Sequence, residues 1–301
     1  MARTYTNLDG TTPDKGLGDL LRWQLNRKKD TTEFTTPVRP NDGSALHASA
    51  PSLTWIGHAT YAMRLGGRMI VTDPVWSERV GPQRRRAPPG VALDQMPAID
   101  VVTVSHTHYD HLDLPTLRRI GANPLYVVPS DVGDILRSAG LPNVVELGWW
   151  QTHEHAGLRV TLVPAQHWSM RVPWDRNKRL WGGFVIESAE GTAYHAGDTA
   201  FSERVFSEIG ARFPSIDWAL LPIGAYDPEW FMSGQHMNPE DAVRAFDLLG
   251  ARHFCAMHWG TFKLTDEPLG EPPARARASF EATPRSAKLH IPDVGETIAL
   301  G

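Results

Sequence analysis

Four side chains of types that bind metal ions stand within six residues of this sequence. His106, His108, Asp110 and His111 follow a short β-branched run at residues 101–104. In an α-helix, side chains two positions apart point to different sides, so His106 and His108 could not share an ion there. In a turn at the carboxyl end of a strand they can converge, and open α/β sheets usually place their sites at such ends. The spacing therefore predicts a metal site in a loop that follows a strand.

Three further candidate ligands lie downstream, and each follows a strand-like run. His167, Asp198 and His258 come directly after such runs. A catalytic zinc ion takes about three protein ligands and keeps one position open. The seven candidates exceed that number, so we expect two metal ions. Histidine and aspartate ligands without cysteine suit zinc, and they also suit manganese or iron.

The elements that must position these residues are short strands that alternate with helical segments. Strands are predicted at residues 52–55, 61–65, 69–72, 101–104, 125–128, 144–147, 159–163, 183–187, 192–195, 218–221, 254–257 and 288–291. Helices are predicted at residues 114–120, 132–139 and 239–249. For the last helix, Asn238 is the expected N-cap and Gly250 the expected left-handed exit. This alternation indicates sheets covered by helices, in one domain that spans residues 51–301.

Residues 1–50 form a polar N-terminal extension rich in Thr, Pro, Asp and Gly. One amphipathic helix is predicted in it, at residues 16–29, with basic side chains beside an apolar face. The leucines of that face are Leu17, Leu20, Leu21 and Leu25. A basic amphipathic helix can lie on an anionic membrane. Packing of the helix on the main domain is the alternative.

The composition excludes several classes of protein. The chain has 301 residues and a net charge of −4, so nucleic acid is not an expected partner. A single cysteine, Cys255, excludes an internal disulfide. No secretory signal and no apolar run of about 18 residues is visible, so we expect a cytoplasmic protein, with peripheral attachment to a membrane as an option. The sequence does not specify an oligomeric state, and a homo-oligomer is left open.

Eight segments resemble one branch of the metallo-β-lactamase fold superfamily. That branch contains N-acylphosphatidylethanolamine-hydrolysing phospholipase D and its bacterial relatives. The segments are residues 55–60 (WIGHAT), 72–75 (TDPV), 105–113 (SHTHYDHLD), 164–168 (PAQHW), 177–181 (NKRLW), 194–199 (YHAGDT), 221–226 (LPIGAY) and 258–262 (HWGTF). The resemblance implies an α+β fold, the four-layer αβ/βα sandwich.

The resemblance also implies a binuclear zinc centre. One ion would be bound by His106, His108 and His167, the other by Asp110, His111 and His258, and Asp198 would bridge the two. Asp110, Asp198 and His236 are the expected catalytic residues. Asp73 and His58 are expected just outside the ligand set, where Asp73 would orient the ligand histidines by hydrogen bonding.

Four residues are expected to contact the substrate: Gln235, His236, Tyr226 and Lys178. Gln235 and His236 stand just before the capped helix, and the resemblance implies that this segment lines the pocket. The Tyr226 phenol would donate to a phosphoryl oxygen, and Lys178 would meet an anion. A structural or solvated role is the alternative for each of them.

Two metal ions about 3.5–4 Å apart can share a hydroxide and clamp a phosphodiester. The resemblance implies phospholipase D-type hydrolysis of N-acylphosphatidylethanolamine to phosphatidic acid and an N-acylethanolamine by such a bridging hydroxide. A metallo-hydrolase of the lactonase or small-phosphodiester type is the alternative, and a non-catalytic metal-binding protein is the third hypothesis. The expected partner is accordingly a phospholipid or a small phosphodiester.

Overall fold

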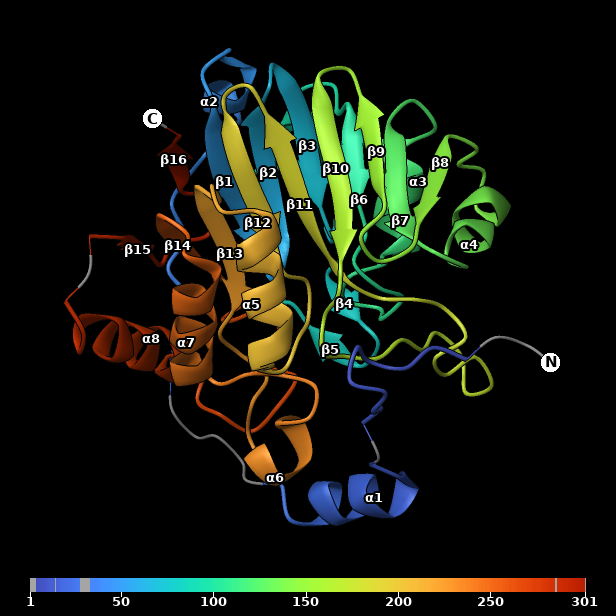
Figure 1. Cartoon of the computed structure of the whole chain (residues 1–301), viewed down its shortest axis with the longest axis vertical. Helices are drawn as coiled ribbons and strands as arrows, with labels where there is room; N and C mark the ends of the chain where they lie inside the picture. The colour runs from blue at the N-terminus through green and yellow to red at the C-terminus, as the bar shows by residue number, and fades with distance from the viewer. Residues whose placement is uncertain (1–3, 14, 28–32, 285, 301) are drawn as a thin grey trace.

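The computed structural model describes residues 4–13, 15–27, 33–284 and 286–300, and two large sheets face each other in it (Figure 1). The first sheet has the strand order β16-β1-β2-β3-β6-β7-β8. Its strands are β1 (Ser52–Gly57), β2 (Thr60–Leu65), β3 (Arg68–Thr72), β6 (Val101–Thr103), β7 (Leu125–Pro129), β8 (Val144–Leu147) and β16 (Thr297–Ala299). The short strands β4 (Arg79–Val80) and β5 (Gln83–Arg84) pair with each other.

The second sheet has the strand order β15-β14-β13-β12-β11-β10-β9. Its strands are β9 (Thr152–His155), β10 (Leu158–Val163), β11 (Gly183–Ser188), β12 (Gly191–His195), β13 (Trp218–Pro222), β14 (His253–Met257) and β15 (Lys288–His290). β12, β13 and β14 are parallel, whereas β9 to β12 are antiparallel neighbours. In the first sheet, β1 to β3 are antiparallel neighbours and β3, β6, β7 and β8 are parallel. Both sheets are therefore mixed.

Helices cover the outer faces of the sheets. Beside the first sheet are α2 (Ser44–His47), the 3-10 helix η1 (Leu93–Gln95), α3 (Leu114–Ile120) and α4 (Gly133–Ser138). Beside the second are α5 (Glu203–Arg212), α7 (Pro239–Leu249) and α8 (Glu271–Glu281), as Figure 1 shows. Two more helices, α1 (Leu17–Leu25) and α6 (Glu229–Met232), lie at one end of the sheets. The predicted four-layer αβ/βα sandwich is confirmed.

The largest core cluster fills the space between the two sheets. On β3, Ile70 belongs to this cluster, together with Leu162 and Phe184 of the facing sheet. Its neighbours Met69 and Val71 belong to a separate cluster on the outer face. Successive side chains of a strand point to opposite faces, so a strand that is covered on both faces reads as a continuous apolar run.

All the predicted strands and helices are present, and their ends lie within two residues of the expected ones, except that α1 ends at Leu25 instead of residue 29. α7 agrees residue for residue: the Asn238 side chain accepts from Asp241 N at 2.8 Å, and Gly250 has a φ of 64°. Helices α5 and α8 and strands β4, β5, β9 and β16 were not predicted.

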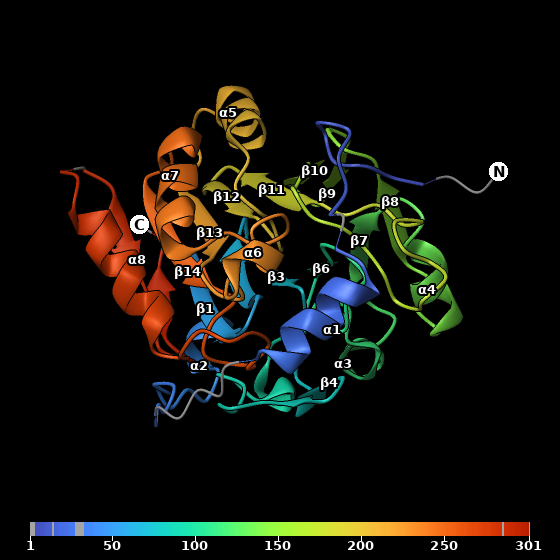
Figure 2. The same ribbon diagram turned by 90° about the horizontal axis from the view of Figure 1, so that it is seen from below.

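The predicted ligands all follow the same end of the sheets. β1, β3 and β6 run in one direction, and the loops after them carry His58, Asp73 and the cluster that begins at His106. In the facing sheet, the segments after β10, β12 and β14 carry His167, Asp198 and His258. Figure 2 looks onto this end, across which α1 and α6 lie.

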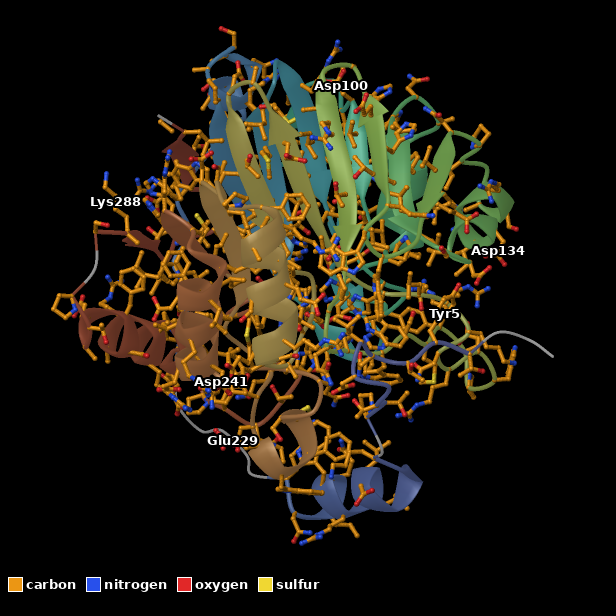
Figure 3. The ribbon with its side chains drawn as sticks, viewed as in Figure 1. Tyr5, Asp100, Asp134, Glu229, Asp241 and Lys288 are labelled. Atoms are coloured by element: carbon orange, nitrogen blue, oxygen red, sulfur yellow. The ribbon has the colours of Figure 1, made fainter. Side chains whose placement is uncertain are left out.

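The N-terminal extension packs on the main domain, where Tyr5 N donates to Asn177 O at 2.8 Å (Figure 3 labels Tyr5). The Trp23 ring of α1 lies 5.1 Å from that of Phe231 on α6, and Val38 forms a β-bridge with Val294. α1 is shorter than the predicted helix, and the predicted basic residues Lys28 and Lys29 lie outside the described residues. The expectation of one helix in this extension was incomplete, because the four-residue helix α2 also forms there.

Candidate metal centre

The histidine-rich loop after β6 is folded into tight turns. Leu112 N donates to His108 O at 2.8 Å, and His111 N donates to the same oxygen at 3.2 Å. These turns bring side chains that are two to five positions apart to one side of the loop. α3 then begins at Leu114, directly after Asp113.

One group of candidate ligands contains His106, His108, His167 and Asp198. His106 Nε2 lies 2.8 Å from His108 Nδ1, which in turn lies 3.3 Å from His167 Nε2. Asp198 Oδ2 is 3.8 Å from both His106 Nε2 and His167 Nε2. Zinc–nitrogen bonds of about 2.0–2.1 Å place neighbouring ligand atoms roughly 3.3 Å apart, so this spacing suits one ion.

A second group adjoins the first and contains His58, Asp110, His111 and His258. Asp110 Oδ2 is 3.7 Å from the Nε2 atoms of both His111 and His258. Asp198 also reaches this group, because its Oδ2 lies 3.2 Å from His111 Nε2 and its Oδ1 lies 3.0 Å from His258 Nε2. The structure thus brings all seven predicted ligands together, with Asp198 between the two groups.

The residues present fit a metal centre by a second criterion. The side chains of His106, His111, His167, Asp198 and His258 are all buried. Several of their polar atoms make no hydrogen bond with a described residue, although they lie 3.0–3.2 Å from one another or from a neighbouring ligand atom: His111 Nε2, His258 Nε2 and Asp198 Oδ1. Such atoms are costly in a folded protein unless something binds them. A cation at this position would bind them.

The electrostatics separate the histidines into two kinds. Burial, followed by the charges of neighbouring histidines, holds the pKa of His106 well below its usual range, and burial lowers the pKa of His108 to about 4. At His258 the effect of burial is outweighed by Asp198 and Asp110, which raise its pKa to about 9. Without metal, His258 therefore carries a proton at neutral pH, and a metal ion that binds there must displace it.

Asp73 orients the centre from behind. Its carboxylate accepts from Ser105 N at 2.6 Å and Ser105 Oγ at 2.7 Å, and it lies 2.6 Å from His111 Nδ1. This contact leaves His111 Nε2 directed toward Asp198. Asp73 thus occupies the place expected for a residue that orients a ligand histidine by hydrogen bonding.

His58 was expected just outside the ligand set, but its side chain lies among the candidate ligands of the second group. Its Nε2 is 3.0 Å from Asp110 Oδ2, and its ring centroid is 4.0 Å from that of His258. The backbone holds it there, because His58 O accepts from His258 N at 3.0 Å. His58 is thus one of four side chains that offer atoms to the second group.

The four expected substrate contacts differ in their surroundings. The His236 ring lies 5.2 Å from that of His167 and 5.5 Å from that of His258, and its buried Nδ1 has no partner among the described residues. The side chain of Gln235 is buried, and its backbone carbonyl oxygen lies 2.7 Å from His167 Nδ1. Tyr226 donates its O–H to Glu271 at 2.7 Å, and Lys178 is exposed. The side chains of His236 and Gln235 are therefore the better placed of the four, whereas the Tyr226 hydroxyl is engaged by Glu271.

Two residues that contribute to the centre were missed in the sequence. Ser105 Oγ lies 2.9 Å from His106 Nδ1 while it donates to Asp73. Asn7 of the extension accepts from His167 N at 3.0 Å and from Trp181 Nε1 at 3.2 Å. Ser105 could have been found, since it begins the histidine-rich run. Asn7 gave no signal, because it is 160 residues from its partner in the chain.

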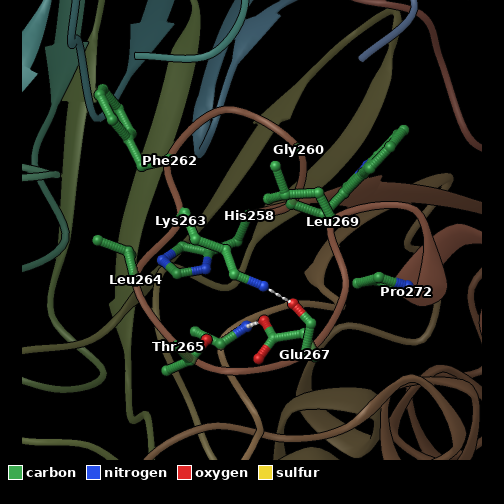
Figure 4. A pocket seen from close by; sticks show the side chains of 11 residues that line it. His258, Gly260, Phe262, Lys263, Leu264, Thr265, Glu267, Leu269 and Pro272 are labelled. Atoms are coloured by element: carbon green, nitrogen blue, oxygen red, sulfur yellow. Dashed lines mark hydrogen bonds between the residues drawn. The ribbon is translucent and has the colours of Figure 1, made fainter. Parts of the chain in front are cut away.

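A small hollow adjoins the centre on the His258 side (Figure 4). Lys263 lies over it and donates to the carbonyl oxygen of Glu267. The Glu267 carboxylate accepts from Ala225 N at 2.7 Å and from Asp227 N at 3.2 Å. These bonds fix the segment around Ala225 and Tyr226 beside the candidate ligand His258.

Comparison with known proteins identifies the family. A family model described as a β-lactamase superfamily domain matches residues 68–259. The chain belongs to the β-lactamase superfamily. The matched range of this superfamily domain contains all seven candidate ligands. The chain is accordingly a metal-dependent hydrolase, because its relatives carry that description.

The superfamily relatives include named phospholipases. An uncharacterized protein of Mycobacterium tuberculosis is 38% identical over 98% of this chain and 82% of its own. The N-acyl-phosphatidylethanolamine-hydrolyzing phospholipase D 1 of Caenorhabditis elegans is 36% identical over 86% of this chain and 78% of its own. A mitochondrial phospholipase of the same name from Saccharomyces cerevisiae is 33% identical over 89% of this chain and 59% of its own.

Solved structures of the superfamily share the fold. An isothiocyanate hydrolase from Delia radicum gut bacteria has a TM-score of 0.66 at 24% identity, covering 82% of this chain and 98% of that one. A metallo-hydrolase from Ignicoccus hospitalis has a TM-score of 0.64 at 24% identity, covering 83% and 97%.

Proposed function

We propose that the chain is a binuclear phosphodiesterase, and that it hydrolyses N-acylphosphatidylethanolamine to phosphatidic acid and an N-acylethanolamine. The observation that carries this proposal is the pair of adjoining ligand groups with Asp198 between them. The phospholipase D names of the nematode and yeast relatives support the choice of substrate.

The proposed cofactor is a pair of zinc ions, for which manganese or iron would be substitutes. His106, His108 and His167 would hold one ion, Asp110, His111 and His258 the other, and Asp198 both. Bound zinc supplies a Lewis acid and lowers the pKa of a bound water to about 7. The ionised carboxylates of Asp110 and Asp198 offset the charge of the two cations.

The chain's own residues would orient the phosphodiester. His108, Asp110 and His236 are only partly buried, so the centre opens to the outside between them. Burial lowers the pKa of His236 to about 4, so its imidazole is neutral at pH 7. A neutral imidazole carries one N–H, which can donate a hydrogen bond to a phosphoryl oxygen or to the leaving oxygen of the substrate. We assign His236 this role, with Gln235 beside it.

The test measures hydrolysis of N-acylphosphatidylethanolamine in mixed detergent micelles by the zinc-loaded chain, with bis(p-nitrophenyl) phosphate and a sugar lactone as comparison substrates. We expect release of an N-acylethanolamine, detected by mass spectrometry. We expect His236→Ala to lower kcat by about 100-fold or more while zinc content is unchanged. His153→Ala, a histidine of β9 outside the centre, is the matched control.

Turnover of bis(p-nitrophenyl) phosphate without lipid turnover would overturn the lipid substrate. Efficient hydrolysis of the lactone alone would establish the alternative, a hydrolase of the lactonase type. Full lipid activity without any bound metal would overturn the binuclear mechanism.

A lipid substrate requires the enzyme to work at a membrane surface, so we propose a peripheral membrane contact. No helix within the described ranges is long and apolar enough to cross a membrane. A cytoplasmic location and a homo-oligomeric state stay predictions.

A further inference from the structure

Exposed apolar side chains are concentrated around the mouth of the metal centre. Seven large hydrophobic residues are exposed in the described part of the chain. Six of them lie on α1, on α6, or on the two loops beside the ligands, and Val38 is the exception: Leu20, Leu21, Leu25, Tyr109, Trp174 and Trp230. We call these six residues the docking face.

The segments that carry the docking face are tied to the metal centre. Trp23 fixes α1 by donating to Asp266 at 2.7 Å and by packing against Phe231 of α6. α6 leads directly to Gln235, whose carbonyl lies at metal ligand His167. Figures 1 and 2 show α1 and α6 together across the end of the sheets where the ligands lie.

The second half of the docking face is tied to the ligand loop. Arg171 donates to Leu112 O at 2.7 Å, and Tyr109 donates its O–H to Arg171 O at 3.0 Å. Tyr109 itself stands between the ligands His108 and Asp110. The loop that presents Trp174 is therefore held against the metal-binding loop.

α1 has two sides of different character, and its apolar outer side has no partner among the residues that the structure describes. Trp23 is 7% exposed and faces α6, whereas Leu21 and Leu25 are 62% and 85% exposed. Positions four apart lie on the same helix face, so these leucines form one outward patch. Helices with an apolar outer face and flanking cations lie in the interfacial plane of a bilayer.

Cations accompany the apolar residues. Arg22 lies 4.9 Å and Lys15 lies 6.0 Å from the Trp230 ring. In the loop, Arg171 lies 3.8 Å from the Tyr109 ring and Arg176 lies 4.6 Å from that of Trp168.

The nearby carboxylates do not cancel this charge. Asp175 is buried, and it is bound by backbone N–H groups and by Arg179. Asp19 and Glu229 keep their negative charges, because they accept from the neutral donors Gly16 N and Asn238 Nδ2. These two carboxylates are outnumbered by the four cations beside the rings, which are Lys15, Arg22, Arg171 and Arg176. The docking face therefore combines aromatic rings, leucines and an excess of cations, which matches an anionic lipid surface.

We propose that this face seats the enzyme on an anionic phospholipid bilayer, with Leu21 and Leu25 inserted among the lipids and the centre facing the headgroups. The inference takes its substrate class from the proposed function, but its test requires no turnover. A second copy of the chain fits less well. In a two-fold interface the same patch meets itself, so the cations around Trp230 would face one another.

The test is cosedimentation of the full-length, zinc-loaded chain with vesicles. One set of vesicles contains phosphatidylglycerol and phosphatidylcholine, and the other contains phosphatidylcholine alone. We expect the wild type to bind the anionic vesicles, and salt to weaken this binding because it screens the cations. Leu21→Gln with Leu25→Gln should weaken it by about tenfold or more, since two apolar side chains no longer insert.

Trp174→Gln tests the second half of the face, which lies on a separate segment. This variant should weaken binding by several-fold, because an exposed tryptophan ring is no longer available to the membrane interface. Val38→Gln is the matched control, since Val38 is also exposed but lies on none of these segments, and it should bind as the wild type does. Substitutions at exposed positions leave the core intact, which circular dichroism would verify. All variants should retain their activity on bis(p-nitrophenyl) phosphate.

Absence of vesicle binding by the wild type would overturn the proposal, as would equal binding by the leucine variant. Self-association of the wild type that is lost in the leucine variant, without an effect on vesicles, would assign the face to a dimer instead. Failure of the proposed function looks different. In that case no lipid is hydrolysed in micelles, yet vesicle binding still depends on Leu21 and Leu25.

Discussion

At the scale of single residues, the centre depends on side chains that hold its ligands in place. Asp73 is buried beneath the cluster and accepts from both the backbone and the hydroxyl of Ser105, besides contacting His111. Asp73 fixes the ring of His111 but is not itself among the predicted ligands. A substitution of Asp73 should therefore lower the metal affinity more than it lowers the stability of the fold.

We predict that Asp73→Asn weakens zinc binding by about 10–100-fold, since an amide cannot replace a carboxylate that accepts all three contacts. Competition with a chromophoric chelator measures the affinity. Asp113→Asn is the matched control, because Asp113 is also buried and bonds Thr116 and Ser77 rather than a ligand. Equal zinc affinity in Asp73→Asn and the wild type would contradict the prediction.

A second residue-scale prediction concerns pH and metal removal. Asp198 and Asp110 raise the pKa of His258 above its usual 6.5 to about 9 in the metal-free protein. That contact stabilises the metal-free fold fully below pH 6.5 and is lost as pH rises through about 9. The loss is on the order of 3 kcal/mol.

Zinc replaces the proton, so the zinc-bound protein does not lose this stabilisation. The difference in Tm between zinc-loaded and chelator-treated protein should therefore grow from pH 6 to pH 9. Differential scanning fluorimetry in matched buffers measures it. A difference that shrinks over this range would show that His258 does not exchange a proton for metal.

At the scale of elements, the N-terminal extension is part of the site. Asn7 accepts from the backbone of His167, and its segment is also held by Tyr5 N, which donates to Asn177 O at 2.8 Å. The extension thus braces the loop that presents the candidate ligand His167, as well as carrying α1.

We predict that Asn7→Ala lowers kcat by several-fold and weakens zinc binding, because His167 N–H loses its acceptor in a buried place. Asn41→Ala is the matched control: Asn41 also bonds across the chain, to Gly295 O and Thr297 Oγ1, and neither of these residues is a candidate ligand. Steady-state kinetics and zinc titration measure both variants. If the two variants lose activity equally, the effect of Asn7 is on stability alone.

Local sequence signals account for most of the elements that were predicted. α7 was predicted in full because Asn238, Pro239 and Gly250 act through neighbours only a few residues away. α5 was missed although Ser202 caps it and Val205, Phe206 and Ile209 face the core. α8 was missed because its two prolines resemble a turn, yet proline fits the first turn of a helix.

The residues of the site likewise divide into those that the local sequence predicted and those that only the packing of distant segments reveals. The seven predicted ligands could be found because each follows a strand. Contacts between distant segments could not, since they arise only when the sheets pack. His58 approaches Asp110 from a loop 52 positions away, and Asn7 reaches His167 across 160 positions.

At the scale of the whole molecule, the centre joins two layers. His106 to His111 follow the first sheet, whereas His167, Asp198 and His258 follow the second. Bound metal ions would therefore connect the sheets at one end, while the core cluster holds them together along their length.

We predict that chelation loosens only that end. In hydrogen exchange followed by mass spectrometry, residues 104–113 and 256–262 should exchange faster in the metal-free protein, because their anchors are lost. β7 and α7 should keep their protection, since Val127 and Phe246 are buried in the core. Uniform deprotection of all these segments would show instead that the fold as a whole requires metal.

The order of the ligands along the chain has a consequence for biosynthesis. The histidines of the first sheet leave the ribosome early, Asp198 later, and His258 last of the seven. β16, close to the end of the chain, then pairs with β1 and completes the first sheet. A nascent chain therefore cannot assemble the first ligand group before Asp198 has been made, or the second before His258. Capture of metal at both groups, and with it hydrolytic activity, must wait until His258 has left the ribosome.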